Sequence, residues 1–101
     1  MIKVNVKRKN NFIKEITLSG HAKYDEYGKD IVCAGVSTSL TVTINACLSF
    51  DKESIIYKES DPFILINVNE SEITNKLFEN LFNTLKVIES DYKKNIIIKE
   101  E

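Results

Sequence analysis

The first twenty residues alternate apolar and polar side chains, which is the pattern of strands with one buried face. In residues 2–8, every second side chain up to Val6 is apolar, and this predicts a strand. The polar break at residues 9–11 suits a hairpin turn, because Asn tolerates the positive φ that such turns need. A second strand is expected from Phe12 to near Gly20, paired antiparallel with the first.

A long apolar segment at residues 31–50 predicts a helix, with Asp30 as its N-cap. Apolar side chains recur at helical spacing but also occupy other faces, so most of the circumference is hydrophobic. We therefore expect the sheet to cover one side of this helix and a second copy of the chain to cover another.

The remaining pattern predicts strands at 53–59 and 62–69, a helix from Ser71 to about Ser90, and a last strand at 92–99. The order is β-β-α-β-β-α-β, without strict alternation of strands and helices. This favours an α+β fold with a mixed, mostly antiparallel sheet and two helices. A chain of 101 residues is expected to form a single domain over its whole length.

Composition and charge narrow the possible functions. The net charge of −1 lacks the basic excess of nucleic-acid binders, so no direct nucleic-acid contact is expected. One His and two Cys are too few for a closed zinc site, and we predict neither metal nor cofactor. No apolar run of ~20 residues predicts a membrane span, and the alternating N-terminus is unlike a signal peptide, so the cytoplasm is expected. The richness in Ile, Lys and Asn indicates a bacterial source with an A and T-rich genome.

The two cysteines fall at opposite ends of the predicted helix. Cys33 lies in its first turn, where the helix dipole and the unpaired N–H groups favour a thiolate, the nucleophilic form. The alternative, that Cys33 is only a small buried hydrophobic residue, stays open on position alone. Cys47 follows fourteen residues later, ~20 Å along the helix, so the two thiols cannot pair and Cys47 is expected in the core.

Small and hydroxyl side chains follow Cys33. Gly35 in the early turns of a helix costs up to ~1 kcal/mol relative to Ala, which is easier to understand if another group must approach the backbone there. The N–H groups of this helix start are candidates for an oxyanion hole. Ser37 lies one turn after Cys33 on the same face and is a candidate partner near the thiol.

His21 supplies the single imidazole, directly after Gly20 at the end of the second strand. The long loop at residues 21–29 must return to the helix, which allows His21 and Cys33 to meet. A Cys–His pair is the minimum for thiol catalysis, with His as base toward the thiol and acid toward the leaving amine. Asp30 is a candidate to orient His21, besides its capping role; a purely structural His is the alternative.

Two short segments carry a family resemblance. Residues 19–22 (Ser-Gly-His-Ala) and 30–37 (Asp-Ile-Val-Cys-Ala-Gly-Val-Ser), in this order and spacing, resemble the ribosomal-processing cysteine protease family, called Prp. The resemblance implies an α+β homodimer that removes a short N-terminal extension from a large-subunit ribosomal protein, cutting after an aromatic or bulky apolar residue. It further implies Cys33 as nucleophile and His21 as base.

The same resemblance implies supporting roles for Asp30 and Ser37, and makes the loop at 21–29 the cover of the active site, with Gly20 and Gly28 as hinges. The first hypothesis is thus a cysteine endopeptidase that matures a ribosomal protein. The alternative is a non-catalytic dimeric module that binds a ribosomal protein or its precursor. A thiol-redox protein is not favoured, because the chain has no C-x-x-C pair.

Overall fold

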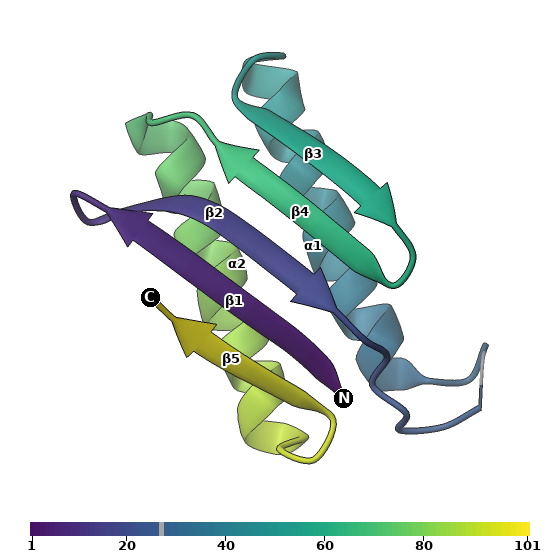
Figure 1. Cartoon of the computed structure of the whole chain (residues 1–101). Helices are drawn as coiled ribbons and strands as arrows, with labels where there is room; N and C mark the ends of the chain where they lie inside the picture. The colour runs from purple at the N-terminus through teal and green to yellow at the C-terminus, as the bar shows by residue number, and fades with distance from the viewer. Residues whose placement is uncertain (27) are drawn as a thin grey trace.

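The protein forms a five-stranded sheet with two helices, seen in a computed structural model that describes residues 1–26 and 28–101. The strand order across the sheet is β3-β4-β2-β1-β5 (Figure 1). Only β1 and β5 run parallel among the described strands; the other neighbours are antiparallel. The elements are β1 (Ile2–Lys9), β2 (Phe12–Ser19), α1 (Ile31–Phe50), β3 (Ile55–Ser60), β4 (Phe63–Val68), α2 (Glu72–Asp91) and β5 (Ile96–Glu100).

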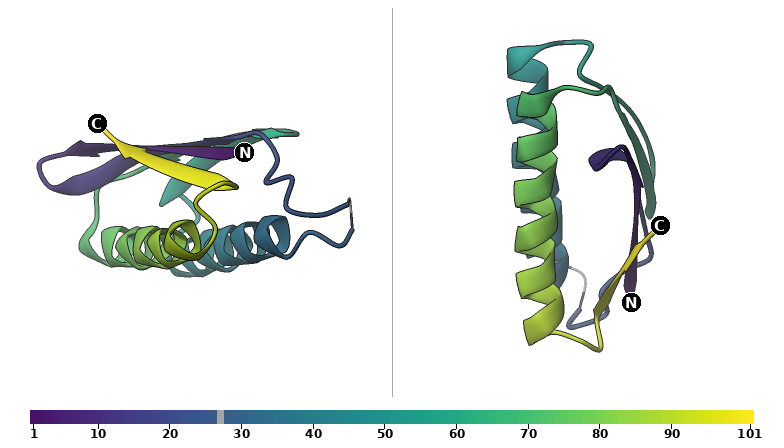
Figure 2. Two further views of the ribbon diagram at one scale, coloured as in Figure 1. Left: turned by 90° about the horizontal axis from the view of Figure 1, so that it is seen from below. Right: turned by 90° about the vertical axis from the view of Figure 1, so that its left-hand side faces the viewer.

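Both helices pack side by side on one face of the sheet, so the molecule has two layers (Figure 2). The alternating strands direct their apolar side chains toward the helices, as their period of two requires. The predicted α+β class, element order and mostly antiparallel sheet are confirmed. The most fully buried large side chains of the core are Phe78, Ile13, Ile16, Ile66, Leu81, Leu85 and Ile96.

Local signals placed most element boundaries to within one residue, but β3 starts at Ile55 and not at residue 53, and the start of β5 differs more. Asn10 and Asn11 have φ values of 54° and 68°, which confirms the predicted hairpin turn. The last strand starts at Ile96 and not at residue 92, because α2 continues to Asp91. The chain then turns with Asn95 N–H donating to the Tyr92 carbonyl at 2.8 Å.

No segment apolar enough to span a membrane is expected from the sequence, but helix α1 meets that criterion. By length and composition alone, its 20 residues would suffice to cross a membrane, a property shared with core helices of globular proteins. One face of α1 does lie in the core, through residues such as Val36, Leu40 and Cys47. On its other side Val42 is 62% exposed, and Phe50, the last residue of the helix, is 67% exposed.

Four segments meet at one end of the molecule. Figure 1 shows the N-terminus, the exit of β2, the start of α1 and the turn between α2 and β5 at this end. The backbone links two of them, because Ile2 N–H donates to the carbonyl of Asn95 at 2.8 Å. All the chemistry predicted from the sequence falls at this end.

Candidate active site

Asp30 caps helix α1, as the sequence predicts. Its Oδ1 accepts hydrogen bonds from the backbone N–H groups of Val32 and Cys33, both at 3.0 Å. Its backbone is extended, with φ −83° and ψ 103°, the conformation of an N-cap residue. The cap fixes where the helix begins, and so sets the position of Cys33 in the first turn.

The second carboxylate oxygen of Asp30 holds the loop. Oδ2 accepts from the N–H groups of Tyr24 at 2.9 Å and Asp25 at 3.4 Å. Desolvation alone would raise the pKa of Asp30, but the hydrogen bonds from Cys33, Tyr24, Asp25 and Val32 outweigh it and lower that pKa from its ordinary value. The hydrogen bonds seen for this carboxylate join it to backbone amides and not to His21. The structure therefore supports a role for Asp30 in capping the helix and holding the loop. The hydrogen bonds of its carboxylate do not support the predicted role in orienting His21.

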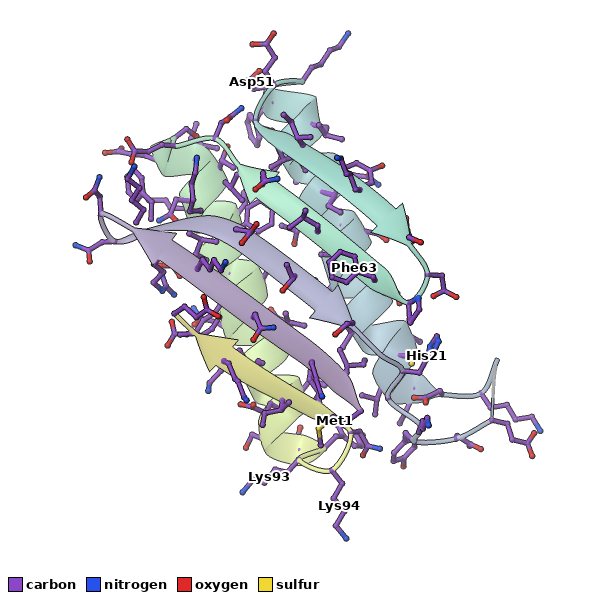
Figure 3. All side chains as sticks on the ribbon, in the orientation of Figure 1. Met1, His21, Asp51, Phe63, Lys93 and Lys94 are labelled. Carbon is purple, nitrogen blue, oxygen red and sulfur yellow. The ribbon has the colours of Figure 1, made fainter. Side chains whose placement is uncertain are left out.

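The strand exit and the helix start meet at the Cys33 sulfur. The backbone N–H of Ala22 donates to Cys33 Sγ at 3.3 Å. His21 precedes Ala22 directly, and Figure 3 shows it where β2 leaves the sheet, beside the first turns of α1. The expectation that the loop brings residues 21 and 33 together is confirmed.

A cavity of about 750 Å³ opens between the loop and the start of α1. Its lining includes five of the residues singled out in the sequence, namely His21, Gly28, Asp30, Cys33 and Ser37. His21 is exposed and Cys33 is partly exposed, so both are accessible to a substrate. A smaller cavity of about 120 Å³ adjoins it and shares His21, Cys33 and Ser37.

Gly20 has a clear backbone reason to be glycine. Its φ is +83°, and a Cβ at this position would overlap the carbonyl oxygen of Met1. Gly20 lines the smaller cavity and lets β2 turn toward the helix with Met1 against it. Gly28 also has a left-handed φ of +85°, but a Cβ there would meet nothing within 4 Å.

Gly35 does not serve the site in the way its position in the sequence suggested. A Cβ on Gly35 would point toward Ile88 Cδ1 of α2, at an ordinary contact distance of 3.7 Å. Gly35 is not among the residues lining either cavity. A methyl group would therefore fit between α1 and α2, so the packing does not require glycine at this position, and neither cavity brings a ligand to it.

The helix-start amides are not arranged as an oxyanion hole in this structure. The N–H groups of Val32 and Cys33 donate to the Asp30 side chain, and that of Ala34 donates to the Asp30 carbonyl at 3.0 Å. The capping residue thus takes up the donors that the sequence made available. The amide directed at the sulfur comes instead from Ala22, at the exit of β2.

Two residues of the site carried no signal in the sequence. Asp61, in the turn between β3 and β4, lines both cavities beside His21. Asn95, between α2 and β5, donates from its side chain to the carbonyl of Ala22 at 3.0 Å. A turn around Asp61 was predictable from the sequence. Its position beside the start of α1 was not, because that position depends on the order of the strands in the sheet.

Cys47, near the other end of α1, has surroundings unlike those of Cys33. It is fully buried, at 0% exposure, and both cysteines are free. Burial raises the pKa of the Cys47 thiol, which keeps it protonated and unreactive. Within residues 1–26 and 28–101, no three His, Cys, Asp or Glu side chains lie together as metal ligands would.

Comparison with known proteins identifies relatives over nearly the whole chain. Residues 1–97 match the family model described as cysteine protease Prp. A ribosomal processing cysteine protease Prp from Staphylococcus aureus is 31% identical, covering 83% of each chain. One from Mycoplasma genitalium is 31% identical, covering 100% of this chain and 97% of its own.

The fold matches a solved structure of the same kind. The crystal structure of the ribosomal processing protease Prp from Staphylococcus aureus, in complex with a covalently linked product peptide, superimposes with a TM-score of 0.95. The two chains are 26% identical and each is covered completely. A second Staphylococcus aureus structure, in complex with a substrate peptide, gives a TM-score of 0.88 at 25% identity.

Proposed function

Because this chain belongs to the cysteine protease Prp family and is a cysteine peptidase, we propose that it removes the N-terminal extension of a large-subunit ribosomal protein. In this proposal Cys33 is the nucleophile and His21 is the base. The relatives named above process ribosomal proteins, and one of them is held with a covalently linked product peptide. Such a precursor is made in the cytoplasm, where we expect this chain to work.

One observation carries the assignment of residues. The Cys33 sulfur lies 3.3 Å from the amide of Ala22, so the residue next in the chain to His21 touches the nucleophile, at the wall of an open cavity. The thiol is held by the first turn of a capped helix and the imidazole by the exit of a strand, so both belong to defined elements. Nucleophile and base within reach of each other are the minimum for covalent acyl transfer.

The proposed chemistry proceeds in two stages. His21 takes the proton of the Cys33 thiol, and the sulfur lone pair forms a bond to the carbonyl carbon of the scissile peptide. The tetrahedral intermediate collapses as the C–N bond breaks, and the imidazolium gives its proton to the leaving amine. A water molecule, deprotonated by His21, then attacks the thioester carbon, and the sulfur leaves with the proton returned by His21.

The direct test is cleavage of a ribosomal protein precursor that bears its N-terminal extension. We expect the wild-type chain to release the extension, and Cys33→Ala and His21→Ala to lose that activity while remaining folded. Cys47→Ala is the matched control, because it removes the other thiol of the same helix and is expected to cut the precursor. The pattern is read by mass spectrometry of the two products.

The outcomes separate the two hypotheses. If Cys33→Ala cuts the precursor as well as wild type, the assigned nucleophile is wrong. If wild type leaves the precursor intact but binds it, the alternative of a non-catalytic module that holds a ribosomal protein precursor replaces the proposal. Cleavage of an unrelated unfolded protein at the same rate would contradict the ribosomal substrate.

We also propose that the chain is a homodimer joined through the free side of α1. No charged residue occurs anywhere in residues 31–50, and the outer side exposes Ile31 at 56% and Val42 at 62%. A helix side without any charge is unusual for a solvated surface and fits an interface between copies. This interpretation agrees with the apolar circumference noted in the sequence.

Analytical ultracentrifugation tests the dimer. We expect a mass near twice 11.6 kDa for wild type and a shift to monomer for Val42→Glu, which places a charge on this side. Val87→Glu, an equally exposed valine at 62% on α2, is the matched control and should remain dimeric. A monomeric wild type at tens of micromolar would contradict the interface.

A further inference from the structure

The turn between α2 and β5 reaches into the active site through one side chain. Asn95 Nδ2 donates to the carbonyl of Ala22 at 3.0 Å, across 73 positions of sequence. The N–H of the same Ala22 donates to Cys33 Sγ. We propose that Asn95 is a positioning residue for the nucleophile: it holds residue 22 so that the Ala22 N–H stays directed at the Cys33 sulfur.

The Asn95 side chain is itself held by its own backbone. Asn95 N–H donates to the Tyr92 carbonyl, and the Asn95 carbonyl accepts from Ile2 N–H, both at 2.8 Å. These bonds fix the turn independently of the side-chain amide. A change confined to the side chain therefore removes the link to Ala22 and leaves the turn itself bonded.

The segment that Asn95 holds needs an external restraint. Lys23, directly after Ala22, has a φ of +55°, a left-handed conformation that is uncommon for residues other than Gly. Ala22 itself is 1% exposed, so its carbonyl would be costly to leave unpaired. Tyr24 packs edge-on against Tyr92 with ring centroids 5.3 Å apart, which brings the same turn against the loop a second time.

The Ala22 amide is chemically the right group at the sulfur. A thiolate is a better acceptor than a thiol, so an N–H donor aimed at Sγ favours the nucleophilic form. The helix-start amides of Val32 and Cys33 already donate to Asp30. The orientation of the Ala22 amide, and with it the backbone of His21, therefore depends on what holds residue 22 from the other side.

Asn95→Asp tests this role, because it keeps the shape and replaces the donor by an oxygen that repels the Ala22 carbonyl. Asn83→Asp, the same chemical change at an exposed site on α2, is the matched control. We expect Asn95→Asp to slow iodoacetamide alkylation of Cys33 on the order of tenfold, the scale of one lost hydrogen bond. Asn83→Asp should leave the rate unchanged.

A spectroscopic measurement distinguishes positioning from general loosening. In the wild-type chain, the NMR signal of the Ala22 amide should move on Cys33→Ala, because its acceptor is removed. In the Asn95→Asp background the same Cys33→Ala change should move that signal much less. If Asn95→Asp is too unstable for the assay, Asn95→Ala removes the donor without adding charge. The shift of the Ala22 amide signal on Cys33→Ala in the otherwise wild-type chain does not depend on either variant.

The kinetic readout rests on the proposed peptidase reaction, whereas alkylation and NMR do not. With a precursor substrate, Asn95→Asp should lower kcat about tenfold with KM nearly unchanged. The proposal is overturned if Asn95→Asp equals Asn83→Asp in alkylation, or if the Ala22 amide of the wild-type chain ignores Cys33→Ala. Loss of cleavage in Cys33→Ala together with either result would leave the peptidase assignment standing and remove only the role of Asn95.

Discussion

Helix α1 carries both cysteines of the chain, and its two ends give them opposite surroundings. Cys33 stands in a capped first turn, partly exposed, with a backbone N–H from the loop after β2 directed at its sulfur. Cys47 lies fourteen residues later, fully buried, with its pKa raised by burial alone. The residue type and the helix are the same, so the difference comes from what the rest of the fold brings to each end.

The comparison teaches that the surroundings of the first-turn thiol are assembled from several segments. Asp30 sets the helix start, Gly20 lets the strand approach, and the amide of Ala22 reaches the thiol. At the other end, packing alone surrounds the sulfur.

The largest expected contrast is in thiol chemistry. With limiting iodoacetamide at neutral pH, Cys33 should be alkylated at least about 100-fold faster than Cys47, because Cys47 is reached only when the core opens. Peptide mapping by mass spectrometry gives the two rates in one sample. Equal and slow modification of both thiols would contradict the idea that the helix start activates Cys33.

Next in size is the effect of a methyl group at the strand exit. Gly20→Ala should lower the free energy of unfolding by about 3 kcal/mol, since the Cβ adds a clash with the Met1 carbonyl to the cost of a left-handed φ. Gly28→Ala has the same left-handed φ but open space, so it should cost only about 1 kcal/mol. Urea unfolding measures both, and equal losses would show that the contact with Met1 is unimportant.

The two helix caps form a smaller contrast. Asp30→Ala should cost about 2 kcal/mol, because it frees four backbone amides, whereas Ser71→Ala removes the single bond to Thr74 and should cost about 1 kcal/mol. Urea unfolding at pH 7 gives both values. A larger loss for Ser71→Ala would contradict the loop-holding role of Asp30.

The loss at Asp30 also has a pH signature. Its pKa is lower in the folded chain than the ordinary value of 3.8, so its stabilisation is complete above that value and is lost as the pH falls through the folded pKa. The difference in free energy of unfolding between wild type and Asp30→Ala should therefore become smaller below pH 3.8. The gap for Ser71→Ala, which removes no titrating group, should not follow this course.

The smallest expected effect is at Gly35. Gly35→Ala should raise the free energy of unfolding by about 0.5–1 kcal/mol, because a helical Gly is replaced where the Cβ meets Ile88 at an ordinary distance. Precursor cleavage should be unchanged. A loss of activity with unchanged stability would show that the backbone at residue 35 does serve the site after all.

Much of the fold was predictable from the sequence, because its signals are local. The alternation in the first twenty residues, the Asn pair of the hairpin and the two N-caps each depend on a few neighbouring residues. The start of the last strand was wrong by four residues, since Asn95 and Tyr92 form a turn that no periodic pattern indicates. The contact between position 35 and Ile88 of α2 needed the observed helix orientation.

By itself the sequence determined the elements, their order, the cap on α1 and the pair of motifs that carry His21 and Cys33. The tertiary structure decided which groups surround the sulfur: the amide of Ala22 from the strand exit, and Asn95, 73 residues away from it, behind that amide. Caps and strand patterns are fixed by contacts between near neighbours in the chain. Contacts between distant segments depend on the order of strands and the placement of helices over the sheet, and only the folded chain establishes these.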